Sequence, residues 1–361
     1  MEVTPLDDDC QHSGPPPAEP RSCPVSPPAV TLVMARVLVI GGNLFIGRAL
    51  VEQLLERGDE VTIMHRGQGT PWGAQVGEIR CDRNDVAAVR SALLGTTFEL
   101  VYDNVYDWQR GTSAEQVSAA ATAAASNKLR RYVFTSSIAV YPPGGAYDES
   151  ADLVPADYPL LYGVQKAESE RALFELERSQ GIPVTTIRPA FIYGPRNPFE
   201  REAFFWERML AGRPIIVPED GLSTMQWVHV KDVARGAVLG AEADGRESGR
   251  AYNLAGSPIT QLEYLRLLGG AAGVTPKLVH VPREVLLKKG GQLTAPPLYF
   301  GAFLDIPPIT VRNDRARAEL GLELMSMEEG LRDTFRWHQS QERPAADYTW
   351  EDGVLAERLS R

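Results

Sequence analysis

The sequence predicts an α/β protein with a Rossmann fold, a doubly wound parallel sheet, and a smaller C-terminal substrate domain. Two observations support this prediction. Arg36 to Ile40 is a short β-branched run that leads through a glycine-rich turn into a helix-forming stretch, and Glu60 to Met64 is a second apolar strand. Because buried parallel strands read as continuous apolar runs, the order strand, glycine turn, helix, strand indicates a βαβ unit.

The glycine-rich turn is the segment Gly41-Gly42-Asn43-Leu44-Phe45-Ile46-Gly47. Gly41 permits the tight turn, and Gly47 allows close contact between the helix and the strand. Apolar residues at 50, 51, 54 and 55 give the following helix a face to pack on the sheet. The helix N-terminus then points toward the turn, where its unpaired N–H groups and dipole favour a pyrophosphate.

The remaining βα units follow the same pattern. Asp85 precedes a predicted helix over residues 86–94, and a strand runs from Leu100 to Tyr102. An Ala-rich helix is predicted over about 115–127, and the segment Val184 to Arg188 returns the chain to the sheet.

Three residues form a candidate catalytic group, namely Ser137, Tyr162 and Lys166. Residues 162–178 favour a helix, so Tyr162 and Lys166 should share one face of it. A neighbouring ammonium favours the phenolate and should lower the tyrosine pKa toward neutral pH, while Ser137 would hydrogen-bond the substrate oxygen. Taken alone, such a Tyr–Lys pair also fits a surface ring beside a solvated charge.

Five stretches resemble the extended short-chain dehydrogenase/reductase family, the group of nucleotide-sugar epimerases, dehydratases and related reductases. The resemblance covers about residues 35–338 and rests on Gly41 to Gly47, Thr135 to Tyr141, Tyr162 to Lys166, Arg188 to Pro195 and Trp227 to Ala234. It implies that Tyr162 is the catalytic base or acid, that Lys166 binds the nicotinamide ribose, and that Ser137 orients the reacting oxygen.

The resemblance also implies a set of cofactor-binding residues, which are Gly41, Asn43, Leu44, Phe45, Ile46, Gly47, His65, Arg66, Asp82, Arg83, Asp103, Tyr162, Lys166 and Pro189. Relatives carry a third glycine where this chain has Leu44, whose side chain would crowd the approach to the phosphates. Asp103 would be either a solvated strand end or a contact to the cofactor ribose or substrate. No metal site is expected.

The end of the second strand bears on the choice of cofactor. Relatives that prefer NAD carry an acidic residue there, but this chain has His65-Arg66-Gly67. Because an arginine pairs with a ribose 2′-phosphate that an acid would repel, NADP is favoured over NAD. The alternative is that Arg66 is only a solvated loop residue. Asp82 is expected near the adenine amino group.

The turn without a middle glycine, joined to Arg66-Gly67 and Cys81-Asp82-Arg83, resembles an atypical branch of the family that includes plant chloroplast stem-loop RNA-binding proteins. The leading prediction is therefore an NAD(P)-dependent epimerase/dehydratase or reductase, acting on a nucleotide sugar. The alternative is a weakly catalytic or non-catalytic Rossmann protein that binds RNA or acts as a nucleotide-responsive scaffold. Thirty-seven basic against 47 acidic residues, a net charge of −10, argues against nucleic acid without excluding it.

Composition suggests the N-terminal limit of the fold, and the family resemblance implies the limits of the two domains. Residues 1–33 are Pro-rich and predicted to be a disordered arm, and Met34 is a candidate start. Residues 34–194 with 226–257 should form the Rossmann domain, 195–225 with 258–338 the substrate domain, and 339–361 a peripheral extension. The three cysteines form no disulfide framework or metal-ligand spacing, and no segment resembles a signal peptide or membrane span, so a cytoplasmic protein is expected.

Substrate contacts are expected, by position only, at Asn197, Glu200, Arg201, Gln226 and Trp227. His229 and Asp232 are predicted to organise a helix start rather than to react. A homodimer through the helix that carries Tyr162 is compatible with the family resemblance.

Overall fold

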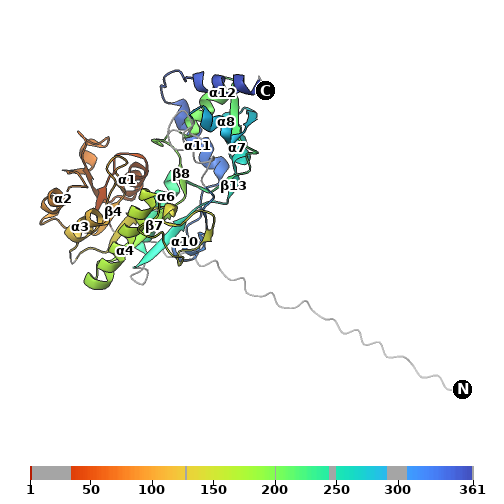
Figure 1. Cartoon of the computed structure of the whole chain (residues 1–361). Helices are drawn as coiled ribbons and strands as arrows, with labels where there is room; N and C mark the ends of the chain where they lie inside the picture. The colour runs from red at the N-terminus through yellow and green to blue at the C-terminus, as the bar shows by residue number, and fades with distance from the viewer. Residues whose placement is uncertain (2–33, 127, 200, 244–248, 291–306, 360–361) are drawn as a thin grey trace. The chain divides into compact units, whose positions relative to one another are not determined.

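The structure is a computed structural model, and it describes residues 1, 34–126, 128–199, 201–243, 249–290 and 307–359. The unit that begins at Met34 is compact. At its centre is a seven-stranded parallel sheet with the order β12-β7-β5-β4-β1-β2-β3 (Figure 1). Its strands are β1 (Arg36–Ile40), β2 (Glu60–His65), β3 (Gly77–Arg80), β4 (Leu100–Asp103), β5 (Arg131–Thr135), β7 (Val184–Pro189) and β12 (Arg250–Leu254).

Helices cover both faces of this sheet, as the doubly wound Rossmann prediction requires. One layer contains α1 (Phe45–Arg57), α6 (Val230–Glu242) and α10 (Asp314–Leu320); the other contains α2 (Val86–Leu93), α3 (Ala114–Ala124) and α4 (Leu161–Gln180). Alternate residues of β1 point to opposite faces of the sheet. Val37 and Val39 therefore pack with α1, and Leu38 and Ile40 pack with α2 and α3. The predicted fold class is confirmed.

A second hydrophobic core lies in the C-terminal part of the chain. It is built from α5 (Arg201–Leu210), α7 (Gln261–Ala272), α8 (Arg283–Lys288), α11 (Met327–Gln339) and α12 (Thr349–Leu359), with the parallel pair β9 (Pro214–Pro218) and β14 (Lys277–Val281). The remaining short strands pair as β6 (Ala146–Tyr147) with β15 (Thr310–Val311), β8 (Phe191–Tyr193) with β11 (Trp227–His229), and β10 (Thr224–Met225) with β13 (Ile259–Thr260).

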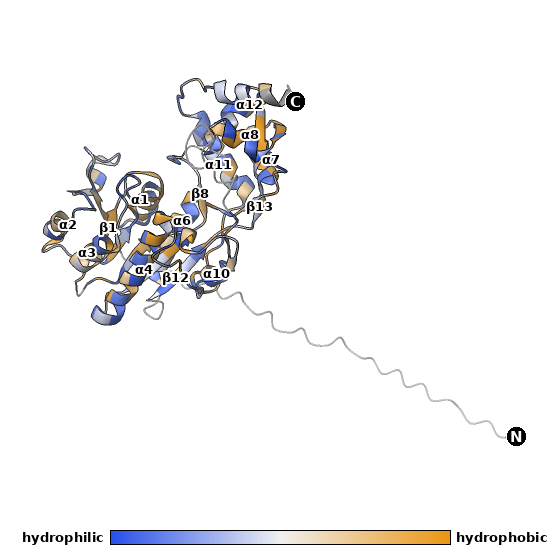
Figure 2. Ribbon diagram, in the orientation of Figure 1, coloured by the Kyte–Doolittle hydropathy of each residue, from blue (hydrophilic) through white to orange (hydrophobic). Residues whose placement is uncertain are grey.

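Residue patterns explain the helix limits. Asp85 caps α2 by accepting a hydrogen bond from the Ala88 backbone N–H, as predicted. The C-terminal end of α4 carries exposed, hydrophilic residues (Figure 2) and stops at Gly181, which adopts a left-handed φ of 70°. Among the described residues, no helix combines the length and apolarity needed to cross a membrane.

Candidate functional site

The predicted catalytic residues meet at the carboxyl end of β5. Ser137 follows this strand at the start of the short 3₁₀ helix η2 (Ile138–Val140), and α4 carries Tyr162 and Lys166 one turn apart. Gly163 permits this approach, because a Cβ there would lie 2.3 Å from the backbone oxygen of Ala139. The close packing of α4 on η2 therefore places the Tyr162 phenol beside Ser137.

Tyr162 holds its proton firmly in this structure. Burial raises its pKa to about 12, and the hydrogen bond with Ser137 opposes this rise only in part. The expected lowering of this pKa by Lys166 is not seen, because the surroundings of the phenol are apolar and aromatic.

Lys166 is buried against the end of β5. Its Nζ donates a hydrogen bond to the backbone oxygen of Thr135 at 2.7 Å and lies 4.5 Å from the centroid of the Phe134 ring. Burial lowers the pKa of Lys166 to about 8. Lys166 therefore still carries its positive charge at pH 7. This charge lies inside the fold, one helical turn from Tyr162.

Two aromatic residues that the sequence did not assign a role surround Tyr162. The Trp108 ring stacks on the Tyr162 ring with centroids 4.9 Å apart, and the Tyr106 ring meets it edge-on at 4.7 Å. Tyr106 also donates a hydrogen bond to Gln165 Oε1 at 2.8 Å. The polar and aromatic composition of residues 103–108 was the only sequence signal for this contact.

The glycine turn has the geometry that its sequence predicts. Gly41 has a φ of 84°, and a Cβ at Gly47 would lie 1.9 Å from the Gly41 backbone oxygen. No side chain caps the start of α1, so the first N–H groups of α1 have no side-chain capping partner. Leu44 is 77% exposed. These features fit a pyrophosphate at the start of α1.

A carboxylate lies beside Arg66, although the sequence indicated none at the end of β2. Arg66 Nη1 lies 2.9 Å from Asp107 Oδ2, and Arg110 pairs with both Asp107 and Asp82. The hydrogen bond from Arg110 holds the pKa of Asp107 below its usual range. The pKa of Asp82 is also lowered, against the effect of burial, by the backbone N–H of Asn84 and then by Arg110. His65 instead contacts Glu78, with 3.1 Å between Nε2 and Oε2.

Arg83 and Asp103, two of the predicted cofactor contacts, pair with each other inside the fold. Both side chains are buried, and Arg83 Nη2 forms an ion pair with Asp103 Oδ2, which also accepts a hydrogen bond from the Tyr132 hydroxyl at 2.8 Å. Arg83 Nη1 donates to the Gln116 backbone oxygen at 2.7 Å. Asp103 is thus not a solvated strand end, and contact of Asp103 or Arg83 with a cofactor stays a prediction.

The substrate candidates fall into two groups. Asn197 and Gln226 are buried and used structurally: Asn197 donates to Glu202 at 3.0 Å, and Gln226 donates to the backbone oxygens of Gly256 and Val311. Trp227 is buried with its ring stacked on Tyr264.

Among the substrate candidates that the structure describes, Arg201 is the one that is partly exposed. Its guanidinium lies over the Phe199 ring, with 5.2 Å between Cζ and the ring centroid. Glu200 lies outside the described residues. Pro189 is buried at the end of β7.

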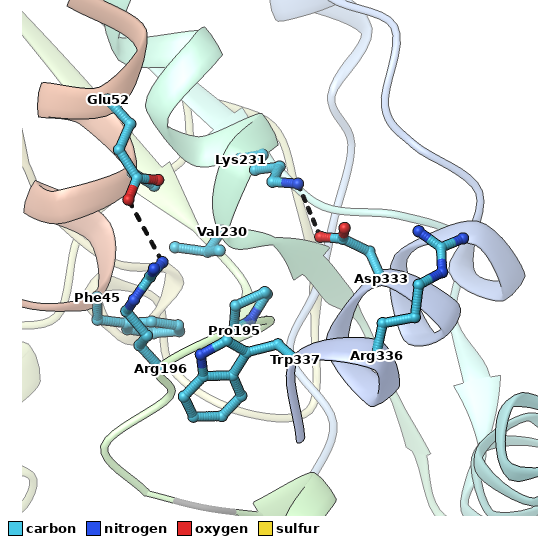
Figure 3. A pocket seen from close by; sticks show the side chains of 10 residues that line it. Phe45, Glu52, Pro195, Arg196, Val230, Lys231, Asp333, Arg336 and Trp337 are labelled. Atoms are coloured by element: carbon cyan, nitrogen blue, oxygen red, sulfur yellow. Dashed lines mark ion pairs between the residues drawn. The ribbon is translucent and has the colours of Figure 1, made fainter. Parts of the chain in front are cut away.

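A pocket of about 350 Å³ lies apart from the catalytic trio, between the start of α1, the segment after β8, the start of α6, and α11 (Figure 3). Two ion pairs cross its wall, Glu52 with Arg196 at 3.4 Å and Lys231 with Asp333 at 2.8 Å. Its lining also includes Phe45 of the glycine turn, but neither Ser137, Tyr162 nor Lys166.

Comparison with known proteins agrees with this architecture. The profile of the NAD dependent epimerase/dehydratase family matches residues 37–255. A curated relative, the chloroplast stem-loop binding protein of 41 kDa b from Arabidopsis thaliana, is 30% identical over 90% of this chain and 85% of its own length. The dTDP-glucose 4,6-dehydratase of Streptomyces niveus is 26% identical over 84% of this chain and 93% of its own.

Solved structures show the same fold. UDP-glucose 4-epimerase from Thermus thermophilus, in complex with NAD, superposes with a TM-score of 0.67 at 24% identity, covering 85% of this chain and all of that one. From the profile match and the curated relative, the chain belongs to the NAD-dependent epimerase/dehydratase family.

Proposed function

We propose that this protein is an NAD(P)-dependent epimerase/dehydratase or reductase that acts on a hydroxyl-bearing or carbonyl carbon of a nucleotide sugar. The observation that carries this proposal is the meeting of Ser137, Tyr162 and Lys166 at the carboxyl end of β5, the edge of a doubly wound sheet where ligands bind. The family membership supports the same reaction class.

The cofactor would be held by the chain in two places. The open N–H groups at the start of α1 would bind the pyrophosphate, and the Arg66, Asp82 and Asp107 group would face the adenosine end. A bound nicotinamide dinucleotide supplies hydride exchange with the substrate carbon. Lys166 would then exchange its hydrogen bond to Thr135 for one to the ribose.

Tyr162 handles the proton of the substrate oxygen. With a pKa of about 12, the phenol is neutral at pH 7 and is ready to donate its proton to a carbonyl oxygen, the direction of reduction. In the direction of oxidation the phenolate form must accept the hydroxyl proton, and because this form is scarce at pH 7, oxidation should be favoured by higher pH. Ser137 would hold the reacting oxygen in both directions.

The choice between NADP and NAD depends on Arg66. The arginine that favoured NADP already pairs with Asp107, so a ribose 2′-phosphate would have to displace this carboxylate. NADP binding through Arg66 therefore stays a prediction, and NAD, which is bound in the similar solved epimerases, is the other cofactor to test.

A turnover panel tests the proposal. Purified protein is incubated with NAD or NADP and with UDP-glucose, UDP-glucuronic acid or dTDP-glucose, and sugar nucleotides and reduced nicotinamide are followed. Conversion should fall by about 10²–10⁴-fold in Tyr162→Phe. Tyr158→Phe is the matched control, since Tyr158 is a partly exposed phenol nearby in the sequence. Equal activity in wild type and Tyr162→Phe would contradict the proposal.

RNA binding is a second candidate function, and one comparison favours it. The curated relative that is 30% identical over 90% of the chain is named as a stem-loop binding protein. A net charge of −10 opposes this function, because phosphate backbones are held by clustered cations. Retention of a stem-loop RNA that weakens steeply with rising salt would support it, and absence of retention at low salt would reject it.

A further inference from the structure

Within the described residues, the side-chain amide of Asn104 is hydrogen-bonded at only one of its two polar atoms. Asn104 follows β4, and its Oδ1 accepts a hydrogen bond from Thr135 Oγ1 at the end of β5. Its Nδ2 is buried and has no partner among them. The great majority of buried polar groups in folded proteins are hydrogen-bonded, because an unpaired one loses its bonds to water. This nitrogen is therefore a donor available to a ligand.

Asn104 is held against the glycine turn. Its N–H donates to the Ile40 backbone oxygen at 3.1 Å, directly before Gly41. A Cβ at Gly41 would lie 2.4 Å from Val105 Cγ2, so the residue after Asn104 also packs closely on the turn. Together with the Thr135 hydrogen bond, these contacts orient the amide before a ligand binds, and little side-chain entropy is left to lose.

The same hydrogen-bonded group includes Lys166. Thr135 accepts the Lys166 ammonium on its backbone oxygen at 2.7 Å and donates its hydroxyl to Asn104. Thr135 thus connects the unpaired amide directly to the lysine that is expected to bind the cofactor.

The strand order places Asn104 between the two expected ends of the cofactor site. The strands β5, β4 and β1 are neighbours in the sheet, in this order. Lys166 lies at the end of β5 and the glycine turn follows β1, so Asn104 lies at the end of the middle strand. A dinucleotide that reaches from the glycine turn to Lys166 must cross this strand with the part between its pyrophosphate and its nicotinamide. That part is a ribose, whose oxygens can accept from an amide N–H.

We propose that Asn104 is a cofactor-binding residue whose Nδ2 donates a hydrogen bond to the ribose on the nicotinamide side of the dinucleotide. This inference rests on the proposed function and assigns its site a further residue. Thr135 is a positioning residue, because its hydroxyl occupies Oδ1 and directs Nδ2 toward the ligand. Asn104 is half-buried, so a ligand reaches Nδ2 once the covering side chains shift, as Lys166 must when it exchanges Thr135 for the ribose.

Three ligands that each add one part to the one before locate the contact. Affinities of ADP, ADP-ribose and NADH are measured by calorimetry with the full chain, for wild type, Asn104→Leu and Thr135→Val. Asn104→Leu should weaken ADP-ribose and NADH about tenfold and leave ADP unchanged, because ADP lacks the second ribose. Thr135→Val keeps the amide but removes the hydroxyl that orients it, so its loss should be smaller, about threefold.

Stability without nucleotide distinguishes a binding role from a structural one. The double variant Asn104→Leu with Thr135→Val replaces the hydrogen-bonded pair and the unpaired donor by apolar groups of similar shape, so its urea midpoint should equal or exceed that of wild type. Asn253→Leu is the matched control, because this buried amide accepts from the Tyr141 hydroxyl and donates to the Arg312 backbone oxygen. The control should lower the urea midpoint and leave NADH affinity unchanged.

Each of the other outcomes overturns this role of Asn104. Equal weakening of ADP and ADP-ribose in Asn104→Leu would place the contact at the pyrophosphate or show a displaced turn. A fall in urea midpoint for the double variant as large as that for Asn253→Leu would make the amide a structural group. If wild type binds the nucleotides and Asn104→Leu binds them equally well, the ribose contact fails alone. If wild type binds none of the three ligands, the proposed function fails and the ribose contact fails with it.

Discussion

Charged residues near the expected position of the cofactor form ion pairs with one another. Asp107 pairs with Arg66 and Arg110, and Arg110 also pairs with Asp82. The side chain of Arg66 is 63% exposed, so its pair with Asp107 is weak, at most about 1 kcal/mol. A ribose 2′-phosphate could compete with such a pair, so we expect Asp107 to tune the preference between NADP and NAD.

Asp107→Asn should shift this preference. The asparagine keeps an oxygen for the backbone N–H groups of Gln109 and Arg110 but removes the negative charge that opposes a 2′-phosphate. The affinity for NADPH should rise about fivefold relative to that for NADH, measured by titration of nicotinamide fluorescence. Adding Arg66→Ala should cancel the gain. An equal change for both nucleotides would show that Asp107 does not oppose the phosphate.

The sequence predicted the contacts between residues that lie close together in the chain. A four-residue helical spacing brings Tyr162 and Lys166 together, and a glycine turn needs only its own residues. It could not predict that Asp107 reaches Arg66, because the pair is separated by 41 positions and depends on the path of the loop after β4. For the same reason it did not predict Trp108 on Tyr162, or the burial of Asp103 with Arg83.

Among the elements, α6 illustrates how a histidine can organise a helix rather than react. His229 precedes α6, and its Nδ1 accepts a hydrogen bond from the Lys231 backbone N–H at 3.3 Å. Asp232 Oδ2 accepts from the Met325 backbone N–H at 2.8 Å and thereby ties the segment before α11 to this helix. The His229 contact confirms the predicted helix start, whereas Asp232 lies in the first turn of α6 and contacts another segment. The His229 side chain is fully buried, and burial lowers its pKa to about 4.

This histidine should make folding sensitive to acid. The unfolded chain protonates His229 at its ordinary pKa near 6.5, whereas the folded chain resists until about pH 4. The unfolded state therefore binds more protons in this window, so stability is full above pH 6.5 and falls as the pH drops toward 4, by up to about 3 kcal/mol.

Urea unfolding at pH 7, 5.5 and 4.5 would measure this loss in wild type and in His229→Asn, which keeps a side-chain acceptor for the helix start. The variant should lose less stability between pH 7 and 4.5. A pH dependence identical to wild type would mean that another group governs the acid response.

For the molecule as a whole, the C-terminal helix is part of the second core. The sequence predicted a peripheral extension at 339–361, but Val354 of α12 is fully buried. Arg208 Nε of α5 donates to Glu351 Oε1 at 2.5 Å, and both side chains are buried. The sequence pattern of this short helix did not reveal its partner, because the complementary charge lies 143 positions away on α5.

Two neighbouring acidic residues on α12 allow a matched test of this packing. Glu351→Ala removes the buried carboxylate that accepts from Arg208 Nε, leaving only Glu207 at 3.5 Å from Nη1, and should lower the free energy of unfolding by about 3 kcal/mol. Asp352→Ala removes an ion pair with Arg213. The Asp352 side chain is 59% exposed, so this change should lower the free energy of unfolding by less than about 1 kcal/mol. Chemical denaturation of both variants measures the difference, and equal small losses would show that α12 does not contribute to the core.

The central claim is that this fold binds a nicotinamide dinucleotide where Ser137, Tyr162 and Lys166 meet. The most direct measurement is a titration of the full chain with NADH and NADPH, in wild type and in Lys166→Met. Saturable binding that weakens at least tenfold in the variant is the predicted result, because Lys166 would lose its contact to the ribose. Absence of binding for both nucleotides in the folded wild-type protein would contradict the account.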